Sequence, residues 1–425
     1  MKIAVVGLGH IGLPLAVQYA SRGHEVVGVD VSSRIVDAIN RGESPHLDEQ
    51  TLIDRVPELH AAGRLRATTW EDPSGVGEAN AVVVIVPVVV DDDRQIDFAP
   101  IDAATRDIAA NIGPETLVIY ETTLPVGTTR DRFGPMLEKG SGLHLDRDLF
   151  LAFSPERVLV GRVFVDLRRY PKIVGGTSDE STRRAVEFYR SVLDEGTDVV
   201  AVANAETAEM TKLAETTYRD VNIAYANELA RYASRRGIDI LEVIGAANSQ
   251  PYSHIHQPGV GVGGHCIPVY PHFLFNNDTE LRIPPLARAI NEGMGEFTVD
   301  LVEERVGSLE GQPVLILGIA YRADVREDAF TSAYRLRDEL RAAGAVVYAH
   351  DPYFDAEHLR GRGFEPYDLD NPVPVRVAVL QAGHEAYRSL DPASLPGLAL
   401  FVDGRNALDR APFDAAGVPY VGIGH

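Results

Sequence analysis

One cysteine in a glycine-rich run is the residue of this sequence best suited to covalent chemistry. Cys266 lies in Gly261-Val262-Gly263-Gly264-His265-Cys266-Ile267-Pro268. A lone cysteine is more often a small buried hydrophobic residue, but glycines leave a thiol uncovered and His265 could influence its ionisation. Beside a nicotinamide, a thiol can add to an aldehyde, and loss of hydride then leaves a thioester for water to hydrolyse. The run therefore favours a nucleophilic cysteine.

Zinc binding is the alternative chemistry for this region. Four possible donors lie within thirteen residues, namely His254, His256, His265 and Cys266. With no second clustered set of ligands, this spacing is a poor match to a structural zinc site. We therefore expect no metal.

A second glycine-rich segment points to a dinucleotide. Gly7-Leu8-Gly9-His10-Ile11-Gly12 follows a predicted strand over Lys2–Val6 and begins a predicted helix. These glycines permit a tight turn and let the backbone approach a pyrophosphate at the helix N-terminus. Asp30 lies eighteen residues after Gly12, at the end of the second predicted strand, where its carboxylate can accept hydrogen bonds from the ribose hydroxyls. Because a 2′-phosphate would meet like charge there, the pattern predicts NAD rather than NADP.

The elements that must position these segments alternate between β-branched runs and amphipathic stretches. Strands are predicted at residues 3–6, 26–29, 82–86, 117–120 and 150–153. Near-continuous apolar strands indicate burial on both faces, as in a parallel sheet. Helix patterns between them end at Gly23 and Gly42. This half of the chain predicts a doubly wound α/β domain.

A helix of about eight turns without Pro or Gly is predicted over Ala205–Arg236, ending at Gly237. A short helix near 240–247, a Gly/Pro/His-rich loop over 248–268 and a helix from about 286 to 306 follow. From Pro313 the strand and helix alternation resumes, with strands at 314–317, 346–349, 375–380 and 398–402. We predict an α/β fold with two Rossmann-like doubly wound domains, joined by a long central helix and a helical middle domain. The predicted boundaries are 1–203, 204–308 and 309–425.

The composition excludes several classes of protein. The 425 residues include 40 Lys and Arg against 62 Asp and Glu, a net charge of −22, which disfavours nucleic-acid and anionic-lipid partners. The longest apolar run, 81–90, is about half a bilayer span, and the N-terminus lacks a signal-peptide layout. One cysteine allows no intramolecular disulfide. We expect a cytoplasmic protein with no nucleic-acid or membrane partner.

Seven short motifs occur in order along nearly the whole chain. They are Gly7-Leu8-Gly9-His10-Ile11-Gly12-Leu13-Pro14, Glu121-Thr122-Thr123-Leu124-Pro125-Val126-Gly127-Thr128, Ser154-Pro155-Glu156-Arg157-Val158, Lys172-Ile173-Val174-Gly175-Gly176, Glu209-Met210-Thr211-Lys212-Leu213, Gly263-Gly264-His265-Cys266-Ile267-Pro268 and Asp403-Gly404-Arg405-Asn406. Together they resemble the UDP-glucose/GDP-mannose dehydrogenase family, which oxidises the C6 alcohol of a nucleotide sugar to a carboxylate.

The resemblance implies roles for four residues. Cys266 would be the nucleophile, and Glu156, just past a predicted strand, would activate water for thioester hydrolysis. Lys212 on the long helix would polarise the C6 oxygen and stabilise negative charge there, and Thr123 would help to position water or substrate. The expected NAD contacts are Gly7, Gly9, His10, Ile11, Gly12, Asp30, Arg34 and Thr123.

The loop sequence Gly-Gly-His-Cys-Ile-Pro resembles the branch of the family that acts on UDP-N-acetylhexosamines, in particular UDP-N-acetyl-D-mannosamine. UDP would bind the C-terminal domain, and the enzyme would be a homodimer built along the long helix. The expected substrate contacts are Glu156, Arg157, Val158, Lys212, Thr216, Arg219, Asn222, His256, Gly263, Arg322 and Arg405, with His254 as a further candidate. UDP-N-acetylglucosamine, UDP-glucose and a non-catalytic nucleotide-sugar-binding role are the alternatives.

Several positions depart from the family pattern. Tyr270 stands where an Asp is common, and a phenol, with a reference pKa of about 10, cannot serve as a carboxylate at neutral pH. Thr216 replaces a common Asn, Val88-Val89 replaces Thr-Pro, and Arg322 replaces a Lys. The usual Arg-Glu-Ser-Pro is Ala329-Phe330-Thr331-Ser332. The nucleophile, the hydrolytic Glu and the Lys remain, so we expect a divergent but active enzyme.

Overall fold

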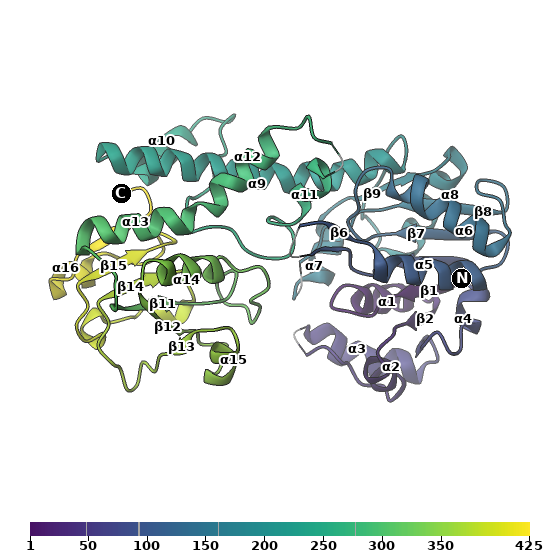
Figure 1. Ribbon diagram of the computed structural model, residues 1–425. Helices are drawn as coiled ribbons and strands as arrows, with labels where there is room; N and C mark the ends of the chain where they lie inside the picture. Colours follow the sequence, from purple (N-terminus) through teal and green to yellow (C-terminus); the bar gives the residue numbers. More distant parts are fainter. Residues whose placement is uncertain (48, 92–93, 160, 277) are drawn as a thin grey trace. The chain divides into compact units, whose positions relative to one another are not determined.

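The computed structural model describes residues 1–425 except 48, 92–93, 160 and 277, and the chain divides into two compact units (Figure 1). The first unit comprises Met1–Glu215 with His272–Asn277, and the second comprises Thr216–Pro271 with Asp278–His425. Each unit contains its own sheet and its own apolar core. Each is described separately below.

The first unit alternates strands and helices along the chain. Its strands are β1 (Lys2–Val6), β2 (Glu25–Val29), β3 (Leu65–Thr68), β4 (Ala81–Val84), β5 (Val89–Val90), β6 (Ile96–Asp97), β7 (Thr116–Tyr120), β8 (Leu149–Phe153), β9 (Lys172–Gly176) and β10 (Val199–Ala201). Its helices are α1 (Gly12–Ser21), α2 (Ser33–Asn40), α3 (Gln50–Ala61), α4 (Ser74–Gly77), α5 (Ala99–Asn111), a π-helix (Thr128–Phe133), α6 (Gly134–Ser141), α7 (Val163–Arg169), α8 (Asp179–Val192) and the start of α9 (Ala205–Arg236).

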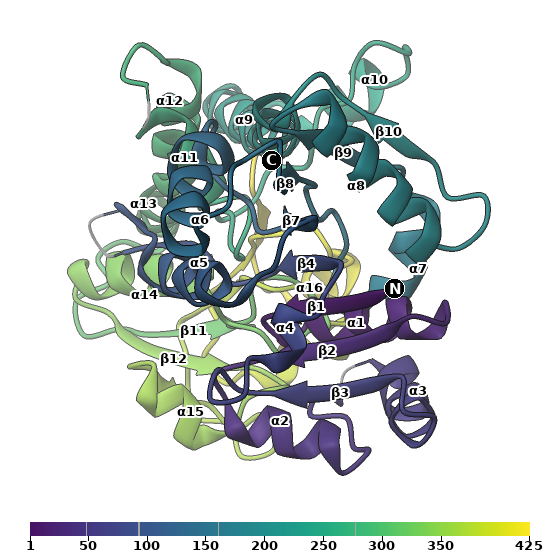
Figure 2. The same ribbon diagram turned by 90° about the vertical axis from the view of Figure 1, so that its right-hand side faces the viewer.

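Eight of these strands form one sheet in the order β10-β9-β8-β7-β4-β1-β2-β3. The middle strands are buried along their length, because helices cover both faces. Side chains of α1, α3, α7 and α8 pack into one core, and α5 and α6 lie together on the opposite face (Figure 2). This is the doubly wound arrangement that the sequence predicts.

One pair in this sheet runs antiparallel. Strand β9 pairs with β8 in the opposite direction, with Phe153 opposite Gly175, whereas the other neighbours in the sheet are parallel. An antiparallel strand begins where its neighbour ends. The first residue of β9, Lys172, therefore lies at the edge of the sheet where β7 and β8 terminate.

The second unit carries the remaining elements. Its helices are the rest of α9, then α10 (Ile240–Ala247), α12 (Ile283–Glu292), α13 (Met294–Val306), α14 (Ser332–Ala342), α15 (Ala356–Gly361) and α16 (Ala411–Ala416), with short 3-10 turns at Glu385–Tyr387 and Pro392–Ser394; α11 (Tyr270–Phe275) falls across the boundary. Its strands are β11 (Pro313–Leu317), β12 (Val346–His350), β13 (Glu365–Pro366), β14 (Val377–Leu380), β15 (Leu400–Asp403) and β16 (Tyr420–Gly422).

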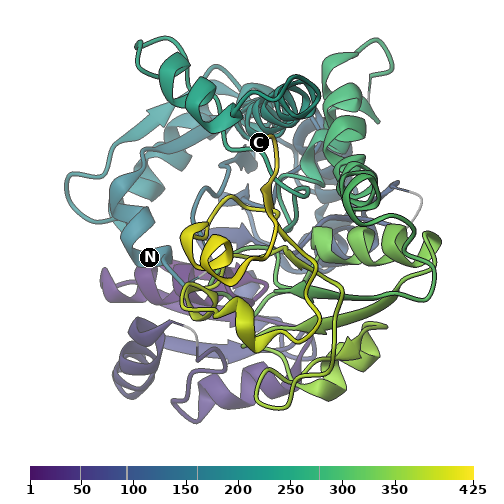
Figure 3. The ribbon, with the colours of Figure 1, turned by 90° about the vertical axis from the view of Figure 1, so that its left-hand side faces the viewer.

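These six strands form a parallel sheet in the order β13-β12-β11-β14-β15-β16. Apolar residues of α13 and α14 pack on one face, and Phe413 of α16 packs with Phe401 and Tyr420 on the other (Figure 3). The predicted fold class, two Rossmann-like sheets with a long helix between them in sequence, is confirmed. The three-domain boundaries stay a prediction.

Local sequence explains the ends of the long helix. Asn204 accepts a hydrogen bond from the backbone N–H of Thr207 through Oδ1 (2.8 Å), which caps the first turn. At the other end Gly237 has φ +62°, and Ile238 N–H bonds to Ala233 O (3.1 Å), which terminates the helix.

The single helix predicted from about 286 to 306 is wrong in one respect. The structure has two helices, α12 and α13, separated by Gly293 with φ −74° and ψ 0°. Glycine is a poor helix former, and here it allows the chain to change direction. Among the described residues, no helix combines the length and the apolar character needed to cross a bilayer.

Candidate functional site

Three charged side chains from separate motifs meet at the carboxyl edge of the first sheet. Glu121 directly follows β7, Glu156 follows β8 by three residues, and Lys172 begins the antiparallel β9. Lys172 Nζ lies 2.7 Å from Glu121 Oε2 and 2.7 Å from Glu156 Oε2. The side chains are 6% (Lys172), 0% (Glu121) and 12% (Glu156) exposed, so water screens these charges weakly.

Two tyrosines complete the hydrogen bonding of Glu121. Tyr19 of α1 and Tyr189 of α8 donate to Glu121 Oε1 at 3.1 and 2.6 Å. Burial raises the pKa of Glu121 to about 7, against the opposing charge of Lys172. Burial also raises the pKa of both tyrosines, so they remain donors at neutral pH.

The carboxylate of Glu156 is oriented by its own loop as well. Its Oε1 accepts hydrogen bonds from the backbone N–H groups of Arg157 (2.7 Å) and Val158 (3.1 Å). Burial favours the neutral acid, but the charge of Lys172 and the hydrogen bonds with Glu121, Lys172 and the backbone N–H of Arg157 outweigh it, and the pKa of Glu156 lies below its ordinary value. Glu156 is therefore a carboxylate at neutral pH.

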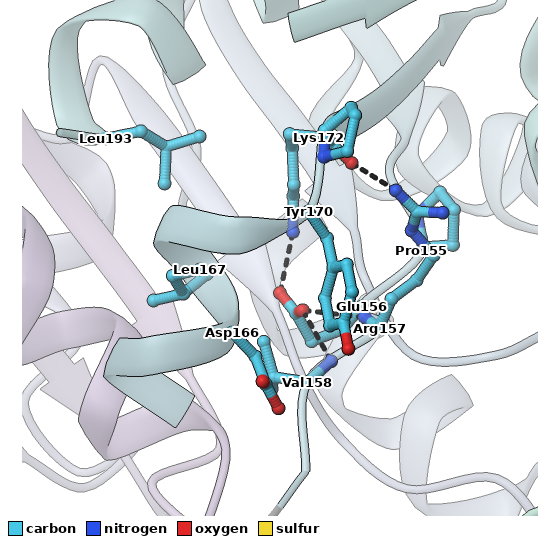
Figure 4. A pocket seen from close by; sticks show the side chains of 10 residues that line it. Pro155, Glu156, Arg157, Val158, Asp166, Leu167, Tyr170, Lys172 and Leu193 are labelled. Atoms are coloured by element: carbon cyan, nitrogen blue, oxygen red, sulfur yellow. Dashed lines mark hydrogen bonds and ion pairs between the residues drawn. The ribbon is translucent and has the colours of Figure 1, made fainter. Parts of the chain in front are cut away.

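Glu156 faces a small cavity of about 10 Å³, near the size that one water molecule needs (Figure 4). Lys172, Tyr170 and Asp166 line it from neighbouring segments. Arg157 also lines the cavity, and its guanidinium donates to Pro171 O and lies 3.4 Å from Glu215. A buried carboxylate beside a water-sized cavity is suited to accept a proton from water.

The predicted dinucleotide turn has the geometry that its glycines suggest. Gly7 has φ +93°, and a Cβ there would lie 2.6 Å from Ile85 O. A Cβ at Gly12 would lie 1.8 Å from Gly7 O, whereas a Cβ at Gly9 would meet nothing within 4 Å. The backbone therefore leaves no room for a side chain at Gly7 or Gly12, whereas the space beside Gly9 is open. The residues present fit a bound pyrophosphate.

Asp30 is fixed beside this turn. Its Oδ2 accepts a hydrogen bond from Leu8 N–H and its Oδ1 one from Ser32 N–H, both at 2.8 Å. These bonds orient the carboxylate but leave further lone pairs for ribose hydroxyls. Of the other predicted NAD contacts, His10 is exposed and packs on the His46 ring at 4.3 Å, and Arg34 is exposed on α2. Ile11 lies just before α1 and is half-buried.

Two further predicted residues of the first unit are buried. Thr123 is 5% exposed, in the loop after β7, and Lys212 is 9% exposed on α9. In the part of the chain that the structure describes, Lys212 forms no hydrogen bond or ion pair, so its ammonium group is available to a ligand. On the same helix Glu209 accepts hydrogen bonds from Gly127 N–H (2.6 Å), Thr129 N–H (2.8 Å) and the Thr129 hydroxyl (2.6 Å). Two of the seven motifs are therefore joined directly.

In the second unit the cysteine loop is packed on the loop after β11. Cys266 is half-exposed, and its carbonyl accepts the N–H of Tyr270 at 2.9 Å. A Cβ at Gly263 would lie 2.9 Å from Phe330 O, and one at Gly264 2.8 Å from the Tyr321 ring. These glycines thus serve close packing within the chain. The imidazole of His265 lies 3.7 Å from Glu327.

Of the two predicted arginines, one is half-buried and one is exposed. Arg405 donates to the carbonyl of Gly261 (2.9 Å), to that of Gln381 and to the Ser332 hydroxyl (3.2 Å), and so holds the start of the cysteine loop. Burial lowers its pKa to about 10, a value at which it remains cationic at neutral pH. Arg322 is exposed and donates to the Tyr321 hydroxyl at 2.9 Å.

The predicted sugar contacts on α9 form a cluster with the start of this loop. Asn222 donates to His254 O (2.7 Å) and accepts from His256 N–H (2.9 Å). Burial and the charge of Arg219 lower the pKa of His256, which is therefore neutral at pH 7. Thr216 is buried on the same helix. The structure brings Arg219, Asn222 and His256 together, as a shared ligand would require.

No sequence pattern indicates a role for Glu121, Lys172, Tyr19 or Tyr189. A signal was present, because Lys172 and Glu121 are charged residues at the ends of apolar strand runs. Their partnership depends on the order of strands and the direction of β9, which local patterns do not specify. Among the described residues, no group of three or more His, Cys, Asp or Glu side chains is placed to hold a metal ion.

Comparisons with known proteins relate nearly the whole chain to one enzyme family. The chain matches three domain descriptions of one family, the UDP-glucose/GDP-mannose dehydrogenase family: the NAD binding domain over residues 1–193, the central domain over 206–293 and the UDP binding domain over 315–410. UDP-N-acetyl-D-mannosamine dehydrogenase of Pyrococcus horikoshii is 35% identical over 100% of this chain and 99% of its own length.

Solved structures agree with these matches. The structure of the Pyrococcus horikoshii enzyme has a TM-score of 0.90 at 33% identity, covering 100% of this chain and 99% of that one. A structure from Methanosarcina mazei, described as an NDP-N-acetyl-D-galactosaminuronic acid dehydrogenase, has a TM-score of 0.89 at 33% identity, covering 100% of this chain and 95% of the other.

Proposed function

This chain belongs to the UDP-glucose/GDP-mannose dehydrogenase family, and on that premise we propose that it oxidises the C6 alcohol of UDP-N-acetyl-D-mannosamine to the uronic acid. It is an NAD-dependent UDP-sugar dehydrogenase, and the predicted cofactor is confirmed by the NAD binding domain. The observation that supports the specific sugar is the similarity, along the whole chain, to the Pyrococcus horikoshii enzyme that acts on it.

We propose the following roles for side chains of this protein. Lys212 polarises the C6 oxygen, and this role is supported by its burial and by an ammonium group that pairs with none of the described residues. The Cys266 sulfur adds to the aldehyde carbon to give a thiohemiacetal, and a thioester remains after the second oxidation. Glu156 takes a proton from water as the oxygen of that water attacks the thioester, and Thr123 positions the water or the substrate. NAD, when bound, takes up a hydride in each oxidation.

The nucleotide part of the substrate is assigned to the second unit. We propose that UDP binds residues 309–425, with Arg322 and Arg405 near the diphosphate, since the family's UDP binding domain covers 315–410. Arg219, Asn222 and His256 then contact the sugar or the diphosphate, as their clustering supports.

A second copy of this chain is the proposed partner. Tyr218, Tyr225 and Tyr232 are 55%, 52% and 50% exposed on α9 and are spaced by seven residues, which places them on one face of the helix. Exposed aromatic stripes of this kind usually mark an interface. We propose a homodimer formed along this face, and a cytoplasmic location.

A panel of nucleotide sugars tests the function. The purified protein is mixed with NAD and UDP-N-acetylmannosamine, UDP-N-acetylglucosamine, UDP-N-acetylgalactosamine or UDP-glucose, and NADH is followed by absorbance while the acid is measured by mass spectrometry. We expect the highest kcat/KM for UDP-N-acetylmannosamine, with two NADH per acid. A higher value for another sugar would reassign the substrate. Binding of NAD and UDP-sugar by calorimetry without NADH from any sugar would instead support a non-catalytic protein.

A further inference from the structure

The ion network behind Glu156 suggests how the strength of this base is set, an inference that rests on the proposed function. Two buried carboxylates, Glu121 and Glu156, share one ammonium group, that of Lys172, at equal distances of 2.7 Å. With both carboxyl groups ionised the three groups carry a net charge of −1, and the pKa of Glu121, raised by burial to about 7, leaves that carboxyl partly protonated at neutral pH. Burying two carboxylates with one cation leaves part of the negative charge uncompensated, and this costs folding free energy.

The groups that face this network come from several elements. Tyr19 and Tyr189 donate to Glu121, and the Lys172 ammonium lies 4.9 Å from the centre of the Tyr189 ring. On the side of Glu156, the cavity is lined by Asp166, Tyr170 and Arg157. Asp166 is engaged by Leu159 N–H (3.1 Å) and lies 3.5 Å from Arg162, and Arg157 is turned toward Pro171 and Glu215. Among the described residues, Lys172 is therefore the cation bonded to Glu156; Glu121 competes for it and also shares a hydrogen bond with Glu156.

We propose that Lys172 and Glu121 are positioning residues for the hydrolytic step: Lys172 keeps Glu156 ionised and oriented, and Glu121 draws away part of the charge of Lys172, so that Glu156 remains basic enough to accept a proton. A carboxylate paired alone with a buried ammonium would be a weak base, and an unpaired buried carboxylate would be protonated and inactive. Because Glu121 and Glu156 share the Lys172 ammonium group, the Glu156 carboxylate is a base of intermediate strength.

The step itself conserves atoms and charge. One O–H bond of water breaks and its proton moves to the Glu156 carboxylate, while the water oxygen forms a bond to the thioester carbonyl carbon. The C–S bond then breaks, and the Cys266 thiolate leaves. No electron transfer is involved, so no oxidant is needed beyond the NAD already consumed. Lys172 and Glu121 act only through Glu156.

Opposite shifts in a pH profile test this proposal. The rate constant for thioester breakdown is measured against pH by quenching the reaction and following the mass of the protein adduct. Lys172→Met should raise the apparent pKa of the acid limb by about 1–2 units, since a cation is removed, so that breakdown slows several-fold near pH 5 and changes little at pH 7. Glu121→Gln should lower that apparent pKa, because Lys172 then pairs with Glu156 alone. Lys172→Arg should restore most of the wild-type profile.

A surface pair of the same chemistry serves as the matched control. Lys2 Nζ lies 2.7 Å from Glu78 Oε2 in the same unit, but the two side chains are 52% and 64% exposed. Lys2→Met and Glu78→Gln should leave the profile unchanged. If Lys172→Met and Glu121→Gln both keep the wild-type acid limb, or move it in the same direction, the proposal is overturned, even if both variants are less stable.

A second measurement separates this inference from the proposed function. The carboxyl carbons of ¹³C-glutamate-labelled protein are titrated by NMR, with Glu156→Gln used to assign the Glu156 signal. The same opposite shifts are expected without any turnover. Absence of NADH with every UDP-sugar would reject the proposed function while these shifts could still appear, whereas full turnover with unshifted titrations would reject only the inference. Circular dichroism shows whether each variant folds. If Lys172→Met does not fold, the titrations of Lys172→Arg and Glu121→Gln test the proposal.

Discussion

Glu156 combines burial with three hydrogen-bond or ionic partners, and its proposed role can be isolated. In the proposed roles Glu156 acts as the base of thioester hydrolysis, a step that follows formation of the thioester. Glu156→Gln should therefore allow the adduct on Cys266 to form and persist, seen as a mass increase of the intact protein after incubation with UDP-sugar and NAD. The double variant Glu156→Gln with Cys266→Ala should show no adduct and no acid. Rapid acid release by Glu156→Gln would assign the base to another residue.

A second buried carboxylate predicts a dependence of stability on pH. Burial raises the pKa of Glu209 to about 7, although hydrogen bonds from Thr129 and Gly127 oppose it. The folded state then binds this proton more tightly than the unfolded state, whose pKa is near 4.5, so stability falls as pH rises from about 5 to 7. The free energy of unfolding of the wild type, relative to Glu209→Gln, should fall by up to about 1.4 kcal/mol per pH unit over this interval.

Urea unfolding at pH 5, 6, 7 and 8 provides this measurement. Glu206→Gln is the control on the same helix, because Glu206 pairs with Arg130 and its pKa lies below its ordinary value, so its contribution is flat over this range. A wild-type advantage over Glu209→Gln that is constant, or that grows with pH, would mean that Glu209 stays ionised throughout.

At the scale of single elements, the dinucleotide turn separates a glycine needed for the fold from one needed for the ligand. A Cβ at Gly12 would collide with Gly7 O, but a Cβ at Gly9 would enter open space. Gly12→Ala should lower both the melting temperature and NAD affinity. Gly9→Ala should leave the melting temperature within about 2 °C and weaken NAD binding at least about tenfold, because its methyl group would enter the open space in which we propose that the pyrophosphate lies. Calorimetry with NAD and a thermal melt distinguish the two, and unchanged NAD affinity in Gly9→Ala would place the cofactor elsewhere.

The elements themselves were largely predictable, for identifiable reasons. The helix at Ala205–Arg236 was predicted with its observed bounds, because it lacks Pro and Gly and ends at Gly237. The apolar runs ending at Val6, Val29 and Phe153 were found as strands because both their faces are buried. Gly293 was overlooked as a break, since a single glycine in an amphipathic pattern is compatible with either outcome.

The candidate site was predictable only in part. Cys266, Glu156 and Lys212 were identified through motifs, and their roles stay predictions. Lys172 and Glu121 lie within motifs, but the motifs indicate no function for them, because their contact depends on strand order across 51 residues of sequence. No local pattern contains that information. The same holds for Arg405, whose bonds to the cysteine loop span 144 residues.

At the scale of the whole molecule, the tyrosine stripe on α9 predicts the state of association. Tyr225→Glu would place a charge in the middle of the proposed interface, which costs much more when buried than when exposed. The variant should run as a monomer in analytical ultracentrifugation, where the wild type runs as a dimer. Tyr252→Glu, at a 92% exposed tyrosine outside the helix, should leave the dimer intact. A monomeric wild type, or a dimeric Tyr225→Glu, would exclude this face.

The antiparallel direction of β9 places Lys172 at the same edge of the sheet as the two acids. Running against β8, it lets the chain return to the same rim within 16 residues, the separation of Glu156 and Lys172. Had those five residues run parallel to β8, the ammonium would sit at the opposite rim, about 13–16 Å from its two acids. The direction of the short strand β9 thus determines whether the buried acids have a cation within contact distance.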